Sequence, residues 1–170
     1  MREIVIYPDP VLRKKAREVK RIDDRVARLA AEMAETMYAA PGIGLAAPQV
    51  GVSERVILVD VTGPERKELI TLVNPVIVEK EGMVIFEEGC LSLPEVREKV
   101  ERAARVLVRG YDLDEREREI EAEGLLAIAL QHEIDHLNGV LFIDYLSRLK
   151  RDMIERKLRK WKREILKERS

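Results

Sequence analysis

The feature that most constrains the fold is a stretch of helical periodicity that contains both histidines of the chain. Between residues 123 and 139, apolar side chains recur at helical spacing, at Leu126, Leu130, Ile134 and Leu137. Asn138-Gly139 is a typical helix end. A helix with this much apolar surface has to be mostly buried, so the other elements must pack around it. His132 and His136 then lie one turn apart on one face.

Composition further limits the number of domains and the cellular compartment. A chain of 170 residues with 46% apolar residues is long enough for one domain with its own core. Although 37% of residues are charged, the formal net charge is only -1. The overall charge of the chain therefore does not indicate a strongly acidic or basic partner. The single cysteine, Cys90, excludes an intramolecular disulfide framework and fits a reducing compartment. No apolar stretch is long enough to span a bilayer, and we expect a soluble, cytoplasmic protein with no membrane partner.

The remaining segments predict the fold class. Residues 23–40 and the stretch that begins at Ser147 have helical spacing of apolar residues. Short β-rich runs lie between them, at 55–60, 70–80, 83–86 and 104–113. Residues 42–51 are rich in Gly. This predicts an irregular segment whose backbone closely approaches another group. We expect an α+β fold in which mixed, mainly antiparallel sheets pack around the central histidine helix, with an N-terminal and a C-terminal helix.

The two histidines suggest a metal site. On one helical face both imidazoles can reach a single ion, and Glu133 projects from the adjoining flank. A catalytic ion needs a third protein ligand and an open position, and no histidine follows His136, which makes Cys90 the natural third ligand. The pattern alone leaves two alternatives open. The histidines could be hydrogen-bonded to neighbours, and a single cysteine is more often a small buried apolar residue.

Three segments together carry a resemblance to a known family. They are Gly42 to Gln49 (GIGLAAPQ), Glu88 to Ser92 (EGCLS) and His132 to His136 (HEIDH). In order and spacing they resemble the three signature motifs of peptide deformylases. The resemblance implies removal of the formyl group from the N-terminal formyl-methionine of newly synthesised proteins. It places residues 1–147 in a metal-dependent catalytic domain and leaves residues 148–170 as a basic amphipathic helix of the same domain.

The resemblance also implies roles for individual residues. Cys90, His132 and His136 would hold the metal, and Glu133 would move the proton of the attacking water. Gln49 and the backbone N–H of Leu91 would stabilise the oxyanion. Outside this family a lone glutamine in such a loop is more often an ordinary polar residue. We also expect Asp135 to pair with Arg102 and fix the helix against the sheet.

Substrate residues follow by the same resemblance. An enzyme that accepts many sequences should bind the peptide backbone by strand addition and test only the first side chain in a pocket. The backbone near Gly44 and Gly89 would pair with the substrate, and the methionine pocket would be lined by Ile43, Phe86, Leu125, Ile128 and Ala129. These apolar side chains could equally be plain core. Arg97 would reach further along the peptide, although exposed arginines are usually only solvated.

The metal and the C-terminal segment are further expectations. Ligand type does not settle the metal, since Cys/His₂ sites suit zinc, Fe(II), cobalt and nickel; the resemblance implies Fe(II) in the cell, with the others as species found after preparation. From Arg148 to Arg169 there are eleven basic and four acidic residues, which can bind phosphate backbone, and the family's C-terminal helix is associated with the ribosome. A solvated helix that packs on the domain is the alternative.

Three rival functions account for less of the sequence. A metalloprotease would use the same helix but leaves Cys90 and the Gln49 loop unexplained. A non-catalytic ribosome-binding module would explain the basic tail and leaves Glu133 without purpose. A structural metal site would need a fourth protein ligand, and the chain has no second cysteine and no third histidine.

Overall fold

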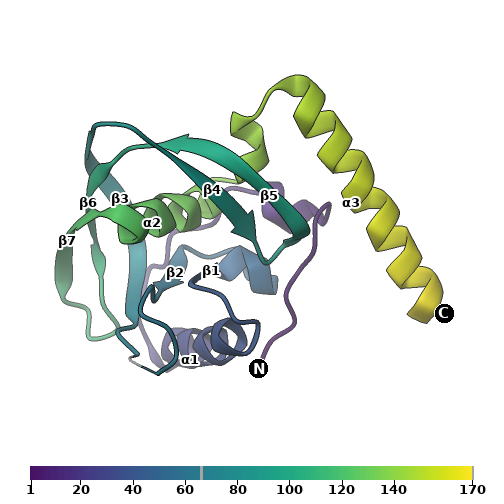
Figure 1. The fold of residues 1–170 in the computed structure, drawn as a ribbon. Coiled ribbons are helices and arrows are strands. Elements are labelled where there is room, and N and C mark those ends of the chain that lie inside the picture. The colour runs from purple at the N-terminus through teal and green to yellow at the C-terminus, as the bar shows by residue number, and fades with distance from the viewer. Residues whose placement is uncertain (66, 170) are drawn as a thin grey trace.

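The computed structural model describes residues 1–65 and 67–169, and it has the predicted α+β architecture (Figure 1). One antiparallel sheet has the order β1-β2-β3-β6-β7 and contains Gly44–Ala46, Val56–Val59, Ile70–Glu81, Arg105–Tyr111 and Glu117–Glu123. The second is an antiparallel pair, β4 (Val84–Cys90) and β5 (Leu93–Arg102). The α-helices are α1 (Asp24–Ala39), α2 (Gly124–Leu137) and α3 (Arg148–Arg169). Short 3-10 helices span Pro10–Arg13, Ala47–Val50 and Phe142–Tyr145.

Helix α2 is buried along most of its length. Leu130, Ile134 and Leu137 pack in one apolar cluster with strand residues such as Ile57 and Val59. The alternate residues of β2, Val56 and Leu58, belong to a second cluster that includes the buried residues of α1. Since successive side chains of a strand point to opposite faces, β2 is buried on both sides, between α2 and α1. This explains why its four residues, VILV, are all apolar.

Helix α3 is fastened to the body at its middle. Leu158 is 1% exposed and belongs to a cluster that also contains Leu93 of β5 and Phe142. Figure 1 shows α3 at the side of the molecule, with its C-terminal end pointing away from the sheets. The middle of the amphipathic helix is therefore docked, and most of its basic residues remain exposed.

The predicted helices and their caps are confirmed to within a residue or two. The Asp23 carboxylate accepts a hydrogen bond from Val26 N at 3.3 Å and caps α1, and Ser147 Oγ accepts one from Lys150 N at 3.3 Å at the start of α3. The histidine helix runs from Gly124 to Leu137, as the pattern predicted. Within the described residues no helix is both long and apolar enough to cross a membrane.

The strand predictions are incomplete. Three strands were not predicted as such: β1, which lies in the Gly-rich segment, most of β5, and β7. In β5 the alternation is broken at Glu95, whose φ of 62° shifts the pattern of buried residues. In β7 the sequence EREIEAE has few apolar residues, because it is an edge strand whose glutamates pair with Arg105 and Arg109 on β6. Strand β5 therefore lacks the period of two on which the prediction rested, and β7 has too few apolar residues for that period to stand out.

Arg55 anchors the end of the central helix. The last carbonyls of a helix have no partner within the helix. Arg55 Nη1 donates to Leu137 O at 2.9 Å, and its Nη2 donates to Asn138 Oδ1 at 3.0 Å. The Ala16 backbone N–H also donates to Leu137 O at 2.7 Å. These contacts tie the C-terminal end of α2 to the first sheet and to the N-terminal segment.

We expect Arg55→Ala to lower the free energy of unfolding by about 1–3 kcal/mol, because it removes charge-assisted hydrogen bonds to a partly buried helix end. Urea denaturation measures this. Arg25→Ala is the matched control, since Arg25 forms a bidentate ion pair with Glu54 but is 55% exposed, and its loss should cost less than about 1 kcal/mol. Equal losses in the two variants would contradict an anchoring role for Arg55.

Candidate metal centre and active-site cleft

Three side chains from two elements meet at one point. His132 and His136 come from α2, and Cys90 is the last residue of β4. His136 Nε2 lies 3.2 Å from His132 Nε2 and 3.4 Å from Cys90 Sγ, and the three ligand atoms are all within 4.8 Å of one another. The helical spacing brings the imidazoles together, and the β4–β5 hairpin brings the thiol.

These separations fit a divalent transition metal. Metal–nitrogen bonds of about 2.0–2.1 Å and metal–sulfur bonds of about 2.3 Å put tetrahedral ligands roughly 3.3–3.6 Å apart. Burial lowers the pKa of His136 well below its usual range, so this imidazole is neutral, as a ligand must be. Three protein ligands leave one tetrahedral position free for water or substrate.

The His132 ring is oriented by a buried ionic network. Its Nδ1 lies 2.9 Å from Glu88 Oε1, which leaves Nε2 to face the metal position. Arg102 clasps Glu88 through Nε and Nη2 at 2.7 and 2.8 Å. Burial acts to raise the pKa of Glu88, but the hydrogen bonds from Arg102 and His132 prevail and hold it at about 2. Arg102 also donates to Asp135 Oδ2 at 2.6 Å, so the predicted Asp135–Arg102 pair is confirmed.

Glu133 is buried next to the metal position. Its side chain is 5% exposed, and burial raises its pKa to about 7. Within the described part of the chain its Oε1 has no hydrogen-bond partner, which is unusual for a buried oxygen and leaves it available to a bound molecule. Gly44 makes room for it, since a Cβ there would lie 2.5 Å from Glu133 Oε2. This is the close approach that the Gly-rich segment predicted.

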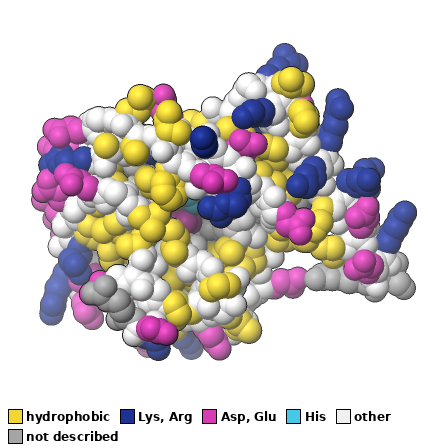
Figure 2. Space-filling view, viewed as in Figure 1, with side chains coloured by type: hydrophobic (Ala, Val, Ile, Leu, Met, Phe, Trp, Pro, Cys, Tyr) yellow, Lys and Arg dark blue, Asp and Glu magenta, His cyan; other side chains and the backbone are white. Residues whose placement is uncertain are grey.

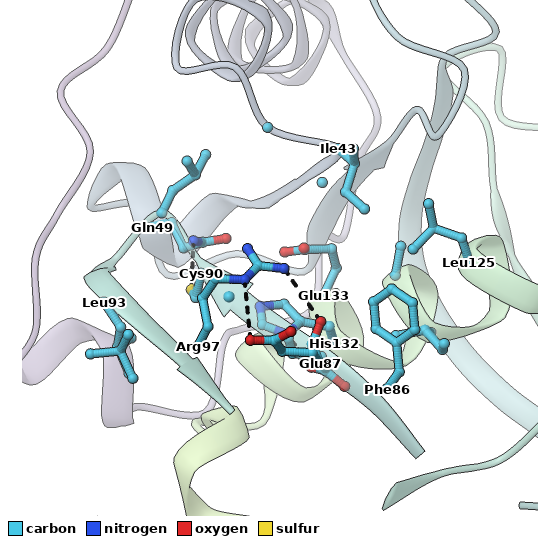
Figure 3. A pocket seen from close by; sticks show the side chains of 18 of the residues that line it. Ile43, Gln49, Phe86, Glu87, Cys90, Leu93, Arg97, Leu125, His132 and Glu133 are labelled. Carbon is cyan, nitrogen blue, oxygen red and sulfur yellow. Dashed lines mark hydrogen bonds and ion pairs between the residues drawn. The ribbon is translucent and has the colours of Figure 1, made fainter. Parts of the chain in front are cut away.

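Gln49 is fixed on the other side of the cysteine. It lies in the 3-10 turn Ala47–Val50 and is 1% exposed. Its Oε1 accepts from Ala46 N at 2.9 Å, which directs Nε2 toward Cys90 Sγ at 3.5 Å and Ser92 Oγ at 3.2 Å. The side-chain amide therefore presents its donor to the space beside the thiol (Figure 3). Leu91 follows Cys90 and lines the same space.

These side chains lie in a cleft of about 520 Å³ between β1, the β4–β5 hairpin and α2. Its lining includes all eight residues predicted to bind substrate: Ile43, Gly44, Phe86, Gly89, Arg97, Leu125, Ile128 and Ala129. Figure 3 shows Ile43, Phe86 and Leu125 on one side of Glu133. Figure 2 shows hydrophobic side chains gathered on this face of the molecule. The structure brings the predicted residues together, and their individual roles remain predictions.

Gly89 and Arg97 are paired across the hairpin. They are register partners in β4 and β5, and Arg97 Nη1 lies 3.0 Å from where a Cβ of Gly89 would be. The missing side chain lets Arg97 cross β4 toward the cleft, where it forms a loose ion pair with Glu87 at 3.8 Å. Because both side chains are mostly exposed, this pair contributes little to stability.

A Cys/His₂ cluster with a free coordination position, beside a buried glutamate in an apolar cleft, defines a metal-dependent hydrolase. Comparison with known proteins narrows this class. The family model described as polypeptide deformylase matches residues 1–152. A peptide deformylase of Syntrophobacter fumaroxidans is 53% identical over 164 residues, which cover 96% of this chain and 95% of the relative. One of Alkalilimnicola ehrlichii is 52% identical over 158 residues, with 93% and 89% covered.

Solved structures agree. A crystal structure of a peptide deformylase from Legionella pneumophila superposes with a TM-score of 0.92 at 50% identity, covering 100% of this chain and 99% of the other. One from Ehrlichia chaffeensis in complex with actinonin has a TM-score of 0.90 at 40% identity, covering 96% and 98%. The chain belongs to the polypeptide deformylase family, the metal-dependent hydrolases that remove the N-terminal formyl group from newly made peptides. The predicted family and enzyme class are confirmed.

Two residues of the site had no assigned role in the sequence-based prediction. Glu88 was part of a quoted motif, but its contact with His132 was missed; Ser92, which accepts from Gln49, was missed as well. A glutamate two residues before a candidate ligand on a strand could have revealed Glu88, because that spacing tends to put both side chains on one face. Ser92 is the last residue of the same quoted motif, but no local pattern indicated its contact with Gln49.

We expect Glu88→Gln to weaken metal binding by about 10- to 100-fold, because a neutral amide is a poorer acceptor for His132 and leaves Arg102 with one carboxylate partner. Competition between the protein and a chelator for Zn(II) or Co(II) measures the affinity. Glu87→Gln is the matched control, since Glu87 is the adjacent residue of the same strand but is 59% exposed. If the Glu88→Gln variant held metal as tightly as the control, the assigned role would be contradicted.

Proposed function

We propose that this chain hydrolyses the formamide bond of N-formyl-methionyl peptides and so removes the formyl group. One divalent metal, held by Cys90, His132 and His136, would take part. The observation that carries the proposal is the convergence of the three ligand atoms within 4.8 Å, beside a buried glutamate whose Oε1 has no partner among the described residues. When bound, the metal lowers the pKa of a coordinated water into the neutral range. All other groups needed for hydrolysis are side chains and backbone of the cleft.

Glu133 acts as the general base and then as the general acid. Its pKa of about 7 lets it both accept a proton from water and return one to the leaving amine near neutral pH. Gln49 Nε2 and the backbone N–H of Leu91 donate to the formyl oxygen as negative charge develops there. Gln49 suits this role because its own carbonyl is already engaged by Ala46 N, so its amide does not have to reorient.

The substrate lies as an extended strand between β1 and β4. Gly44 and Gly89 offer backbone on the two walls of the cleft, and Ile43, Phe86, Leu125, Ile128 and Ala129 form the pocket for the methionine side chain. Arg97 lies at the rim and binds further along the peptide. The partly exposed apolar side chains support this arrangement: Ile43, Phe86 and Leu125 are 42%, 37% and 37% exposed without substrate.

The expected metal in the cell is Fe(II), with zinc, nickel or cobalt as species acquired during preparation. A thiolate with two imidazoles accepts all four ions, so availability rather than ligand type selects among them. We also propose that residues 1–147 form the catalytic domain, that residues 148–170 are a basic helix of that same domain, and that the protein acts in the cytoplasm. The burial of Leu158 against the body supports the single domain.

The test is formate release from a short N-formyl-methionyl peptide by anaerobically purified protein loaded with Fe(II). Glu133→Ala should lower kcat by about 10²- to 10⁴-fold while metal content stays the same, because it removes the proton-transfer group and no ligand. Glu164→Ala, an exposed glutamate on α3, is the control and should behave as wild type. No release by folded, metal-loaded wild type would overturn the proposed activity, and full activity of the Glu133→Ala variant would overturn the role of Glu133.

We propose further that α3 docks on ribosomal RNA. Figure 2 shows Lys and Arg side chains projecting along this helix. Five of them line a recess of about 610 Å³ with Pro8 and Leu166: Arg156, Arg159, Lys160, Lys162 and Arg163. Clustered cations of this kind bind a phosphate backbone by releasing its counterions. Because Leu158 is buried, deletion of the helix would disturb the core, and substitutions of exposed residues are the better test.

A triple variant with Arg159, Lys160 and Arg163 changed to Gln should co-sediment with ribosomes more weakly at low salt, and its salt dependence should flatten by a slope of about 2–3. Its kcat/KM on a short peptide should be unchanged, because no described residue of α3 lines the cleft. A triple Gln variant at Lys14, Lys15 and Lys20, exposed residues of the N-terminal segment, is the control. Equal weakening in both variants would mean nonspecific attraction, and no weakening in either would end the docking proposal.

A further inference from the structure

A chain of hydrogen bonds runs from the molecular surface to a metal-ligand histidine, and its outermost member is Tyr145. The Tyr145 hydroxyl donates to Asp135 Oδ2 at 2.7 Å. The same oxygen accepts from Arg102 Nη1 at 2.6 Å. Arg102 in turn holds Glu88, whose Oε1 lies 2.9 Å from His132 Nδ1. Asp135 Oδ2 is shared by Tyr145 and Arg102, and Glu88 Oε1 is shared by Arg102 and His132. Loss of one donor therefore changes how the oxygen binds the other.

Tyr145 contacts the network in two ways. Besides the hydrogen bond to Asp135, its ring lies under the guanidinium of Arg102, with Cζ 4.9 Å from the ring centroid. A cation over an aromatic face at this distance is attracted by the ring quadrupole. Tyr145 therefore holds Arg102 directly through the ring and indirectly through the hydroxyl. The side chain is 51% exposed, so it contributes little to the apolar core.

The Tyr145 ring also borders a recess next to the network. The recess has a volume of about 320 Å³ and is lined by Arg102, Gln131, Asp135 and Tyr145 among others. None of the described residues that line this recess lines the substrate cleft. Water that reached Arg102 and Asp135 through the recess would compete for their hydrogen bonds and weaken the ion pair by raising the local dielectric constant.

We propose that Tyr145 is a positioning residue of the metal centre, which acts through Asp135, Arg102 and Glu88 to hold His132 in the orientation that ligates the metal. The inference rests on the proposed metal site but adds a residue to it that touches neither metal nor substrate. Its contribution is orientation, since a His132 ring whose Nδ1 partner is mobile presents Nε2 less often in the ligating position. Burial and the bond to Asp135 raise the pKa of Tyr145 to about 12, so the phenol remains a donor at neutral pH.

The first test is metal retention. Release of Zn(II) to an excess of chelator should be up to about tenfold faster in Tyr145→Phe, which loses the hydroxyl and keeps the ring. It should be about 10- to 100-fold faster in Tyr145→Ala, which loses both contacts. Tyr111→Phe is the control, because Tyr111 is a comparably exposed tyrosine, 41% exposed, at the end of β6. The absorption spectrum of the Co(II) form should shift in Tyr145→Phe and stay unchanged in Tyr111→Phe.

A second test separates positioning from a purely structural role. Metal-free Tyr145→Phe should unfold at only a slightly lower urea concentration than metal-free wild type, because it loses one half-exposed hydrogen bond. Its KM for a formylated peptide should be unchanged while kcat falls. In Asp135→Asn the hydroxyl has lost its charged partner, so adding Tyr145→Phe should change metal release far less than it does in wild type.

Two outcomes would overturn the proposal: wild-type metal release and Co(II) spectrum in Tyr145→Phe, or additive effects in the double variant. A fall in unfolding stability without a change in metal release would assign Tyr145 a structural role instead. Metal release and the Co(II) spectrum do not depend on formate release. If wild type released no formate, the proposed activity would fail while these measurements still decided the role of Tyr145.

Discussion

The arrangement of the site depends on one buried cation, Arg102. Its side chain is 4% exposed and lies between two carboxylates, Glu88 on β4 and Asp135 on α2. A buried charge without partners would cost several kcal/mol, so Arg102 can be buried only where both acceptors are in place. Since Cys90 belongs to the hairpin and the two histidines belong to the helix, this ion cluster sets the distance between the two halves of the metal centre. The hydrophobic clusters bury the elements, and the ion cluster fixes their relative position.

Small residues determine how closely the walls of the cleft can approach. Gly44 lets the backbone of β1 reach Glu133, and Gly89 lets Arg97 lie across β4. In both places the absence of a side chain leaves backbone next to the cleft, where an extended peptide can form main-chain hydrogen bonds. Gly44 therefore makes room for Glu133, and both glycines leave backbone at the site proposed for the substrate.

Local periodicity predicts the helices, and the resemblance of three short motifs supplies the expected cleft residues such as Gln49 and Leu91. Helix α2 and its face with His132, Glu133 and His136 follow from spacing alone, and Cys90 follows from the lack of any other soft ligand. Strand β5 was missed because the positive φ at Glu95 shifts its alternation, and β7 was missed because its charged edge leaves only Ile120 and Ala122 as apolar residues. Contacts between residues far apart in the chain have no local signature. Glu88 and His132 are 44 residues apart, and such a pair is visible only once hairpin and helix are packed.

Two glutamates near the centre show how environment gives one residue type very different pKa values. Glu88 receives hydrogen bonds from Arg102 and His132, and its pKa of about 2 keeps it ionised at all working pH values. Glu133 is buried, and its pKa rises to about 7. The acceptor that orients His132 should never take up a proton, whereas the proton-transfer role proposed for Glu133 requires a group that binds and releases protons near neutral pH. Arg102 therefore stabilises the first carboxylate, and because it makes no hydrogen bond with Glu133 in the described structure, it leaves the second free to titrate.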